Sequence, residues 1–400
     1  MTKLHFIKLV ANRGLYLSEK EIERIAILAF GISQSKSVNI SKVNDRILEI
    51  ESGCKSKESQ YKCLLKPFQT GNYENLIKTS FQLIVLYFYG GESSVRLVMD
   101  RTNWDLGSEK INILTVGLLT KEDIFIPLVW KDLGYKGNSD SQIRIDLIDR
   151  ILVWWSDLSI SVPTFEICGD REFIGEYWLT ELSRRDINYV IRLRSDLSFE
   201  TWLNGEYKVE KRYNVRILHR YLNMTHQSSI EVVLHNEAIA RVFVVKNEGN
   251  DEKKEPYIYF ITNIEDVKKA ALFYRKRWKI EVFFKYLKSQ GFDLEDFNMS
   301  GQHKTDILMS VLSIVFLMVI DTQEKPKSEN QNIEQPAENN AVYKNGKSYT
   351  RKSTFRKGIS AILEIRSFDN FMPKFIAVLE KIMSNWLFLK NICIMKNCVQ

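Results

Sequence analysis

The stretch SSVRLVMDRTNW, residues 93–104, carries the pattern on which the predicted fold depends. Apolar residues alternate with others before Asp100, which is typical of a β-strand that ends in an acid. Two further strand-like runs, INILTVGLL (111–119) and DIFIPLVW (123–130), follow after short connections. We therefore expect three strands in an antiparallel meander.

A second strand-like run, PTFEICGD (163–170), also ends in an acid, Asp170. Segments with helical periodicity flank it, and INYVIRL (187–193) reads as a fifth strand. If the first and fourth strands are neighbours in one sheet, their carboxyl ends bring Asp100 and Asp170 together. An aspartate at a strand end often only caps a turn or a helix, and for Asp170 that alternative stays open.

A third acid lies within YRKRWKIEVFFKYLK (274–288), which has the periodicity of an amphipathic helix. Its polar face collects one acid with basic and hydroxyl-bearing neighbours: Tyr274, Arg277, Glu281, Lys285 and Lys288. This face is either a solvated surface, with i,i+4 pairs of ~0.3–0.5 kcal/mol each, or a site where bases hold a polyanion and the acid holds a metal.

Three converging carboxylates repel one another in a poorly solvated site, and a divalent cation removes that cost. Carboxylate oxygens are hard ligands that suit Mg²⁺ or Mn²⁺. Two such ions ~3.5–4 Å apart activate a nucleophile and stabilise the leaving oxygen in phosphodiester chemistry. The pattern therefore favours Asp100, Asp170 and Glu281 as ligands of two metal ions.

Composition is compatible with a nucleic-acid partner. The 400 residues carry a net charge of +7, and eight Lys or Arg between positions 268 and 288 are opposed only by Glu281. The five cysteines show no zinc spacing, and no secretory signal is apparent. The apolar run at 307–320 is shorter than the ~20 residues of a membrane span, so we expect a buried core helix.

These residues resemble a known family. Tyr274, Arg277, Glu281 and Lys288 have the identities and spacing of the Y-R-E-K signature of bacterial insertion-sequence DDE transposases. The blocks DRTNW, GDREFIG and IPLVWKDLGYKGNSD are similar to other parts of that family. The resemblance implies an α/β, RNase H-like (retroviral-integrase-like) catalytic core with an inserted all-β subdomain, plus helical N- and C-terminal regions.

The resemblance also implies roles. Asp100, Asp170 and Glu281 would be the catalytic, metal-binding triad. The DNA-binding residues would comprise the bases and hydroxyl of the polar face together with an aromatic in the insert that stacks on a flipped base: Tyr274, Arg277, Lys285, Lys288 and Trp202. For Trp202, packing within a hairpin is the more common role of such a residue and stays open as an alternative.

The function implied is transposition, by a cytoplasmic, nucleoid-associated bacterial protein without a membrane partner. The protein would bind the terminal inverted repeats of an insertion sequence as a homodimeric synaptic complex, hydrolyse a phosphodiester with Mg²⁺ or Mn²⁺, and join the freed 3′-OH to target DNA. Two alternatives stay open: a nuclease of the same fold that does not join, and a DNA-binding regulator without chemistry.

Along the chain, the sequence predicts alternating helical and sheet-forming regions. The capping-box sequence SEKE (18–21) starts a helix in the first of them, which is compatible with a helix-turn-helix or a plain helical hairpin. The predicted regions are an N-terminal helical DNA-binding region (1–90), the first core part (91–197), a β-rich insert (198–262), the second core part with the Glu281 helix (263–322), a flexible polar linker (323–350) and a helical C-terminal region (351–400).

Overall fold

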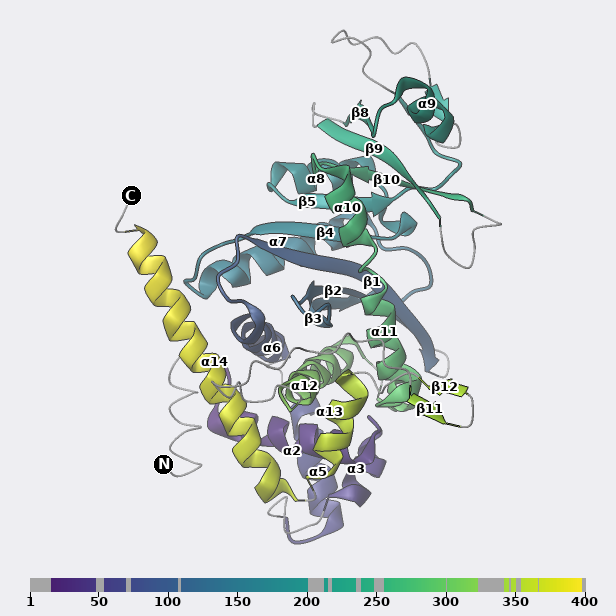
Figure 1. The fold of residues 1–400 in the computed structure, drawn as a ribbon. Helices are drawn as coiled ribbons and strands as arrows, with labels where there is room; N and C mark the ends of the chain where they lie inside the picture. The colour runs from purple at the N-terminus through teal and green to yellow at the C-terminus, as the bar shows by residue number, and fades with distance from the viewer. Residues whose placement is uncertain are drawn as a thin grey trace. The chain divides into compact units, whose positions relative to one another are not determined.

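The computed structural model describes most of the chain, namely residues 16–47, 54–69, 73–106, 109–200, 212–214, 218–234, 239–247, 255–299, 301–322, 342–344, 347–349, 354–365 and 367–397. It divides into two compact units. Unit 1 combines Met1–Tyr87 with Leu287–Ser384, and unit 2 combines Phe88–Tyr286 with Asn385–Gln400. Figure 1 shows the helices and strands of both units.

Unit 2 is built on an eight-stranded sheet with the order β3-β2-β1-β4-β5-β10-β9-β8. The first three strands form the predicted antiparallel meander, whereas β4 and β5 run parallel to β1. The strands are β1 (Ser94–Leu106), β2 (Glu109–Leu119), β3 (Phe125–Asp132), β4 (Thr164–Gly169), β5 (Asn188–Arg192), β8 (Ile230–Val233), β9 (Ile239–Lys246) and β10 (Tyr257–Thr262).

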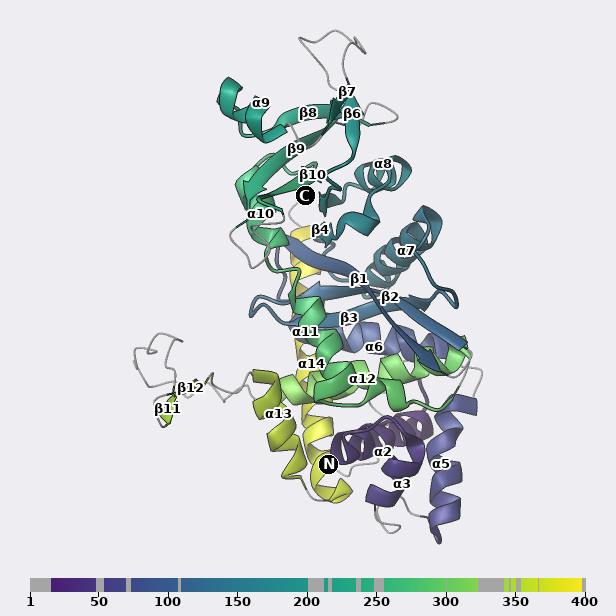
Figure 2. The same cartoon turned by 90° about the vertical axis from the view of Figure 1, so that its right-hand side faces the viewer.

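Helices cover both faces of this sheet. Phe165 of β4 packs edge-on against Trp155 of α7 (Ser141–Asp157). Its neighbour Glu166 binds Lys269 of α10 (Val267–Tyr274) with a 2.6 Å ion pair. Since adjacent strand residues point to opposite faces, α7 and α10 lie on opposite sides. Figure 2 shows α7 and α8 (Glu176–Arg184) on one side and α10 and α11 (Lys279–Lys285) on the other.

The region predicted as a β-rich insert departs from that description in part. Residues Leu218–Thr225 form helix α9, where the sequence predicted a strand, because Leu218 and Leu222 are buried at i,i+4 spacing against the sheet. Strands β8 to β10 continue the main sheet, and a short pair, β6 (Ser198–Glu200) and β7 (Arg212–Asn214), stands beside it. Trp202 lies outside the described residues.

Unit 1 is mainly helical. It contains α2 (Glu19–Ser35), α3 (Ile40–Arg46), α5 (Lys57–Gln69), α12 (Gln302–Asp321), α13 (Thr354–Leu363), nearly all of α6 (Tyr73–Phe88) and the first part of α14 (Phe368–Asn397). The capping box at Ser18 and Glu21 is confirmed by both hydrogen bonds. Most of the predicted linker at 323–350 lies outside the described residues, which include the short strands β11 (Val342–Lys344) and β12 (Lys347–Tyr349).

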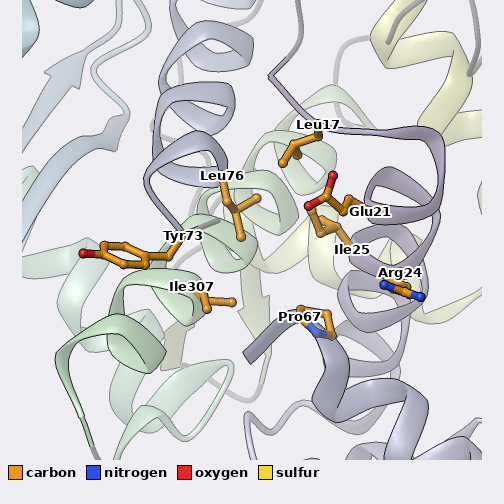
Figure 3. Close-up of a pocket in the computed structure, with 8 residues that line it drawn as sticks. All are labelled: Leu17, Glu21, Arg24, Ile25, Pro67, Tyr73, Leu76 and Ile307. Atoms are coloured by element: carbon orange, nitrogen blue, oxygen red, sulfur yellow. The ribbon is translucent and has the colours of Figure 1, made fainter. Parts of the chain in front are cut away.

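Helix α12 is the core of unit 1. Among the described residues it is the one helix long and apolar enough to cross a membrane, yet 89% of its apolar window is buried inside the protein. It packs against α2, α5 and α13, which confirms the prediction of a buried core helix. A cavity of about 20 Å³ is lined by Ile307 of α12, by Leu17 and by residues of α2, α5 and α6. Figure 3 shows these lining residues. That volume suits about one water molecule.

Candidate active site

The first two predicted acids lie side by side at the point where β4 ends. The prediction that the first strand ends at Asp100 is wrong, because β1 continues to Leu106 through its pairing with β2. The parallel ladder between β1 and β4 ends with Met99 opposite Gly169, so Asp100 and Asp170 are the next residues on neighbouring strands. Asp170 precedes the short 3-10 helix η1 (Arg171–Phe173), but its side chain makes no capping hydrogen bond there. The structure therefore does not support the alternative reading of Asp170 as a helix cap.

The third acid, Glu281, is linked to Asp100 by Arg277, which binds both carboxylates. Arg277 donates one hydrogen bond from Nη1 to Oδ2 of Asp100 at 2.7 Å and another from Nη2 to Oε1 of Glu281 at 2.5 Å. The carboxylates of Asp100 and Glu281 thus share one guanidinium, whose side chain is only 12% exposed. The planar fork of arginine suits this bridging of two carboxylates.

Tyr274 and Arg192 complete the surroundings of Asp170. The Tyr274 hydroxyl donates to Oδ1 of Asp170 at 3.2 Å, and Arg192 Nη1 lies 3.8 Å from the same oxygen. The Arg277 guanidinium lies 5.7 Å from the centre of the Tyr274 ring. Burial raises the pKa of the Tyr274 hydroxyl well above its ordinary value, so this group stays a hydrogen-bond donor.

Burial dominates the electrostatics of Asp100. It raises the pKa of this carboxyl to about 6, although Arg277 and the Arg101 backbone N–H both favour the ionised form. Glu172 and Asp170 add repulsion in the same direction as burial. Ionised Asp100 is therefore under-compensated by its protein neighbours, which is the condition under which a further cation binds favourably.

The prediction of a single helix over 274–288 is wrong. Helix α10 ends at Tyr274, tighter turns with i→i−3 hydrogen bonds follow, α11 spans Lys279–Lys285, and a π-helical turn covers Tyr286–Gln290. The tighter turns allow Arg277 to reach Asp100 while Lys276 binds Asp123 on the loop after β2.

The remaining predicted DNA-binding residues are not part of this cluster. Lys285 is exposed at the end of α11. Lys288 belongs to unit 1, where it pairs with Glu295 at 3.2 Å. Of the residues predicted on the polar face, the structure thus brings together Tyr274, Arg277 and Glu281.

Several residues that hold the site were missed by sequence reasoning. Arg101 directly follows the first acid and binds Glu172, which lies two positions after the second acid. Arg192 binds Glu255 and approaches Asp170. The sequence signal that could have found Arg101 and Glu172 is the presence of charged residues directly after each acid, in DR (100–101) and DRE (170–172). Their pairing with each other depends on strand register, so it could not be predicted from the sequence.

The donor set fits a hard divalent cation. Asp100 and Glu281 bind the Arg277 guanidinium, and Asp170 binds the hydroxyl of Tyr274, three residues before that arginine. Carboxylate oxygens of this kind suit Mg²⁺ or Mn²⁺. Arg277 and Tyr274 at present bind the oxygens that a metal would use. Within the part of the chain that the structure describes, no three His, Cys, Asp or Glu side chains are arranged so that they could hold a metal ion.

The fold and site define an α/β protein with clustered acids beside a strongly basic segment. The family model for the transposase DDE domain matches residues 117–318, a little over half of the chain. The chain therefore belongs to the transposase DDE domain family, and this membership supports a transposase function. The match contains Asp170, Arg277 and Glu281, whereas Asp100 precedes it. Comparison with curated proteins finds none that matches.

Proposed function

We propose that this protein is an insertion-sequence transposase of the Y-R-E-K group, which binds terminal inverted repeats and catalyses metal-dependent DNA cleavage and strand transfer. The observation that carries the proposal is that the linked residues Tyr274 and Arg277 hold Asp170, Asp100 and Glu281, in a chain whose residues 117–318 match the transposase DDE domain. The strand order β3-β2-β1-β4-β5, with β4 and β5 parallel to β1, supports an RNase H-like core to which β10, β9 and β8 are added.

In this proposal Asp100, Asp170 and Glu281 hold two Mg²⁺ or Mn²⁺ ions. When bound, these ions supply charge stabilisation for in-line displacement at phosphorus. The protein's own contribution is orientation: Tyr274 fixes one oxygen of Asp170, and Arg277 holds Asp100 and Glu281 toward each other. Burial of Asp100 keeps bulk water away from one side of the site.

DNA binding follows from the charge of the same segment. Eight Lys or Arg between positions 268 and 288 provide a local positive field for phosphates. Arg277 is the base closest to the acids, so its guanidinium would pair with a scissile-end phosphate that replaces one of its present carboxylate partners. Pairing of two element ends requires two copies of the chain, and we propose a homodimer in the synaptic complex.

The test is a joining reaction. Purified protein is incubated with linear DNA that carries the inverted repeats flanking its gene, a target plasmid and Mg²⁺ or Mn²⁺. We expect cleaved ends and plasmid-joined products with the wild type, and neither with Asp100→Asn. The matched control is Asp105→Asn, because Asp105 lies on the same strand but is exposed and paired with Lys110.

The products separate the competing functions. Cleavage without joined products would support a nuclease of the same fold. DNA binding that is unchanged in Asp100→Asn, without any cleavage by the wild type, would support a regulator and overturn the proposed enzyme.

A further inference from the structure

The ladder that aligns β1 with β4 stops before the acids. Met99 opposite Gly169 is its last pair, so backbone hydrogen bonds between these strands do not fix the spacing of Asp100 and Asp170. Arg101 directly follows Asp100, and Glu172 lies two positions after Asp170. These two side chains bind each other across the gap.

The Arg101 guanidinium uses all five of its N–H groups. Nε donates to Oε1 of Glu172 at 2.9 Å, and Nη2 donates to the other oxygen of the same carboxylate. The three remaining N–H groups bind Oδ1 of Asn138 at 3.0 Å, Oδ1 of Asn112 at 3.3 Å and the carbonyl oxygen of Gly137. A fully occupied guanidinium with a two-point carboxylate contact is rigid in direction as well as in distance.

Both ends of this pair are joined rigidly to the acids. The backbone N–H of Arg101 donates to Oδ1 of Asp100 at 2.8 Å. On the other segment, the N–H of Phe173 donates to the Asp170 carbonyl at 2.9 Å and closes the turn that contains Glu172. Phe173 is fully buried, so this turn is anchored in the core.

A second arginine supports the same turn from α7. Arg144, which is 4% exposed, donates from Nη2 to the Glu172 carbonyl at 3.3 Å and lies over the Phe173 ring at 5.2 Å. It also binds the side chain and carbonyl of Ser139. The Glu172 segment is therefore held on both sides.

From this geometry we propose that Arg101 and Glu172 are a positioning pair, which sets the spacing of Asp100 and Asp170 and thereby the affinity of the acids for a divalent cation. The proposal rests on the proposed function, because it assumes that these acids bind metal. Neither residue is a catalytic residue; each acts through its neighbouring aspartate. Residues that orient metal ligands in this way typically change metal affinity by about 10- to 100-fold when they are altered.

The test measures metal affinity and folding separately. Mn²⁺ is titrated into the protein alone and into its complex with a DNA duplex that ends at the terminus of the insertion sequence. Electron paramagnetic resonance measures the free Mn²⁺ at each step. The variants are Arg101→Lys, Glu172→Gln and their combination. The control is Asp149→Asn, which breaks another two-point arginine–carboxylate pair of unit 2, with Arg185, at 2.6 and 2.9 Å.

We expect each single variant to raise the Mn²⁺ dissociation constant about tenfold, with little further change in the double variant because both substitutions break one contact. Asp149→Asn should lower the melting temperature measured in EDTA without changing the dissociation constant for Mn²⁺. Wild-type-like Mn²⁺ affinity in Arg101→Lys and Glu172→Gln would overturn the positioning pair alone. Absence of Mn²⁺ binding by the wild type would instead refute the proposed function, on which the pair depends.

Discussion

Replacing Asp100 by asparagine should make the metal-free protein more stable at neutral pH. Burial raises the pKa of Asp100 from 3.8 to about 6, and its side chain is only 17% exposed. The folded protein therefore holds a proton that the unfolded chain releases more easily, so stability falls as pH rises between these two values and stays lower above them. Asparagine keeps the shape of the side chain and avoids the buried charge.

The magnitude follows from the shift. At about 1.4 kcal/mol per pKa unit, the gain of Asp100→Asn over the wild type should be roughly 3 kcal/mol at pH 7.5 and only about 1 kcal/mol at pH 4.5. The gain should also shrink when Mn²⁺ is added, because a cation that binds the folded wild type stabilises it selectively. The variant would thus be more stable and inactive at once.

Urea unfolding in EDTA at the two pH values, followed by tryptophan fluorescence, measures this gain. All eight tryptophans fall within the segments of unit 2, so the signal reports on the unit that contains Asp100. Glu181→Gln is the control with opposite sign, since hydrogen bonds from Arg185 and then Arg184 lower the pKa of Glu181 and its loss should destabilise the protein at pH 7.5. A gain in Asp100→Asn that is absent, or equal at both pH values, would refute the reasoning.

Three further outcomes are expected. Chelation of metal ions with EDTA should abolish DNA cleavage but leave DNA binding unchanged in a mobility-shift assay, and added Mn²⁺ should restore cleavage. Cleavage that continues in EDTA would contradict the proposed metal site. Arg277→Lys should slow single-turnover cleavage at least about tenfold, because one ammonium does not reproduce the fork between Asp100 and Glu281; an unchanged rate would argue against it. Gly117→Ala should lower the urea midpoint, by roughly 1–3 kcal/mol in stability, since the new Cβ would lie 2.3 Å from the Ile126 carbonyl oxygen; equal midpoints would show that β2 and β3 adjust.

Strand alternation and short connections were sufficient to predict the meander. The apolar alternation before Asp100 and before Asp170 is a local signal, but the sequence offered the adjacency of their strands only as a condition, which the parallel pairing of β1 with β4 meets. The 100° periodicity likewise predicted that Glu281 shares a face with Arg277, because these residues are four apart and the pairing survives a change of helix type.

Features that depend on tertiary contacts could not be predicted. The helix break after Tyr274 results from turns that are stabilised by contacts with β1 and with the loop after β2, which no local pattern encodes. The run NVRILHRYL (214–222) predicted a strand because Val215, Ile217 and Tyr221 have high strand propensity, but its second half belongs to helix α9, in which Leu218 and Leu222 are buried. The pairing of Glu172 with Arg101 depends on strand register and on the loop that contains Gly137 and Asn138, which also binds Arg101.

The division of the chain has a consequence for its synthesis. Unit 1 needs both ends of its sequence, since α2 and α5 pack on α12, whereas unit 2 is contained almost entirely in the intervening segment. A ribosome adding about 5–20 residues per second needs on the order of 10–40 s to travel from residue 87 to residue 287. The sheet that carries the acids can therefore fold first, before α12 is available to pack against α2 and α5. In a polypeptide released before α12 is made, these early helices would stay exposed to chaperones and proteases.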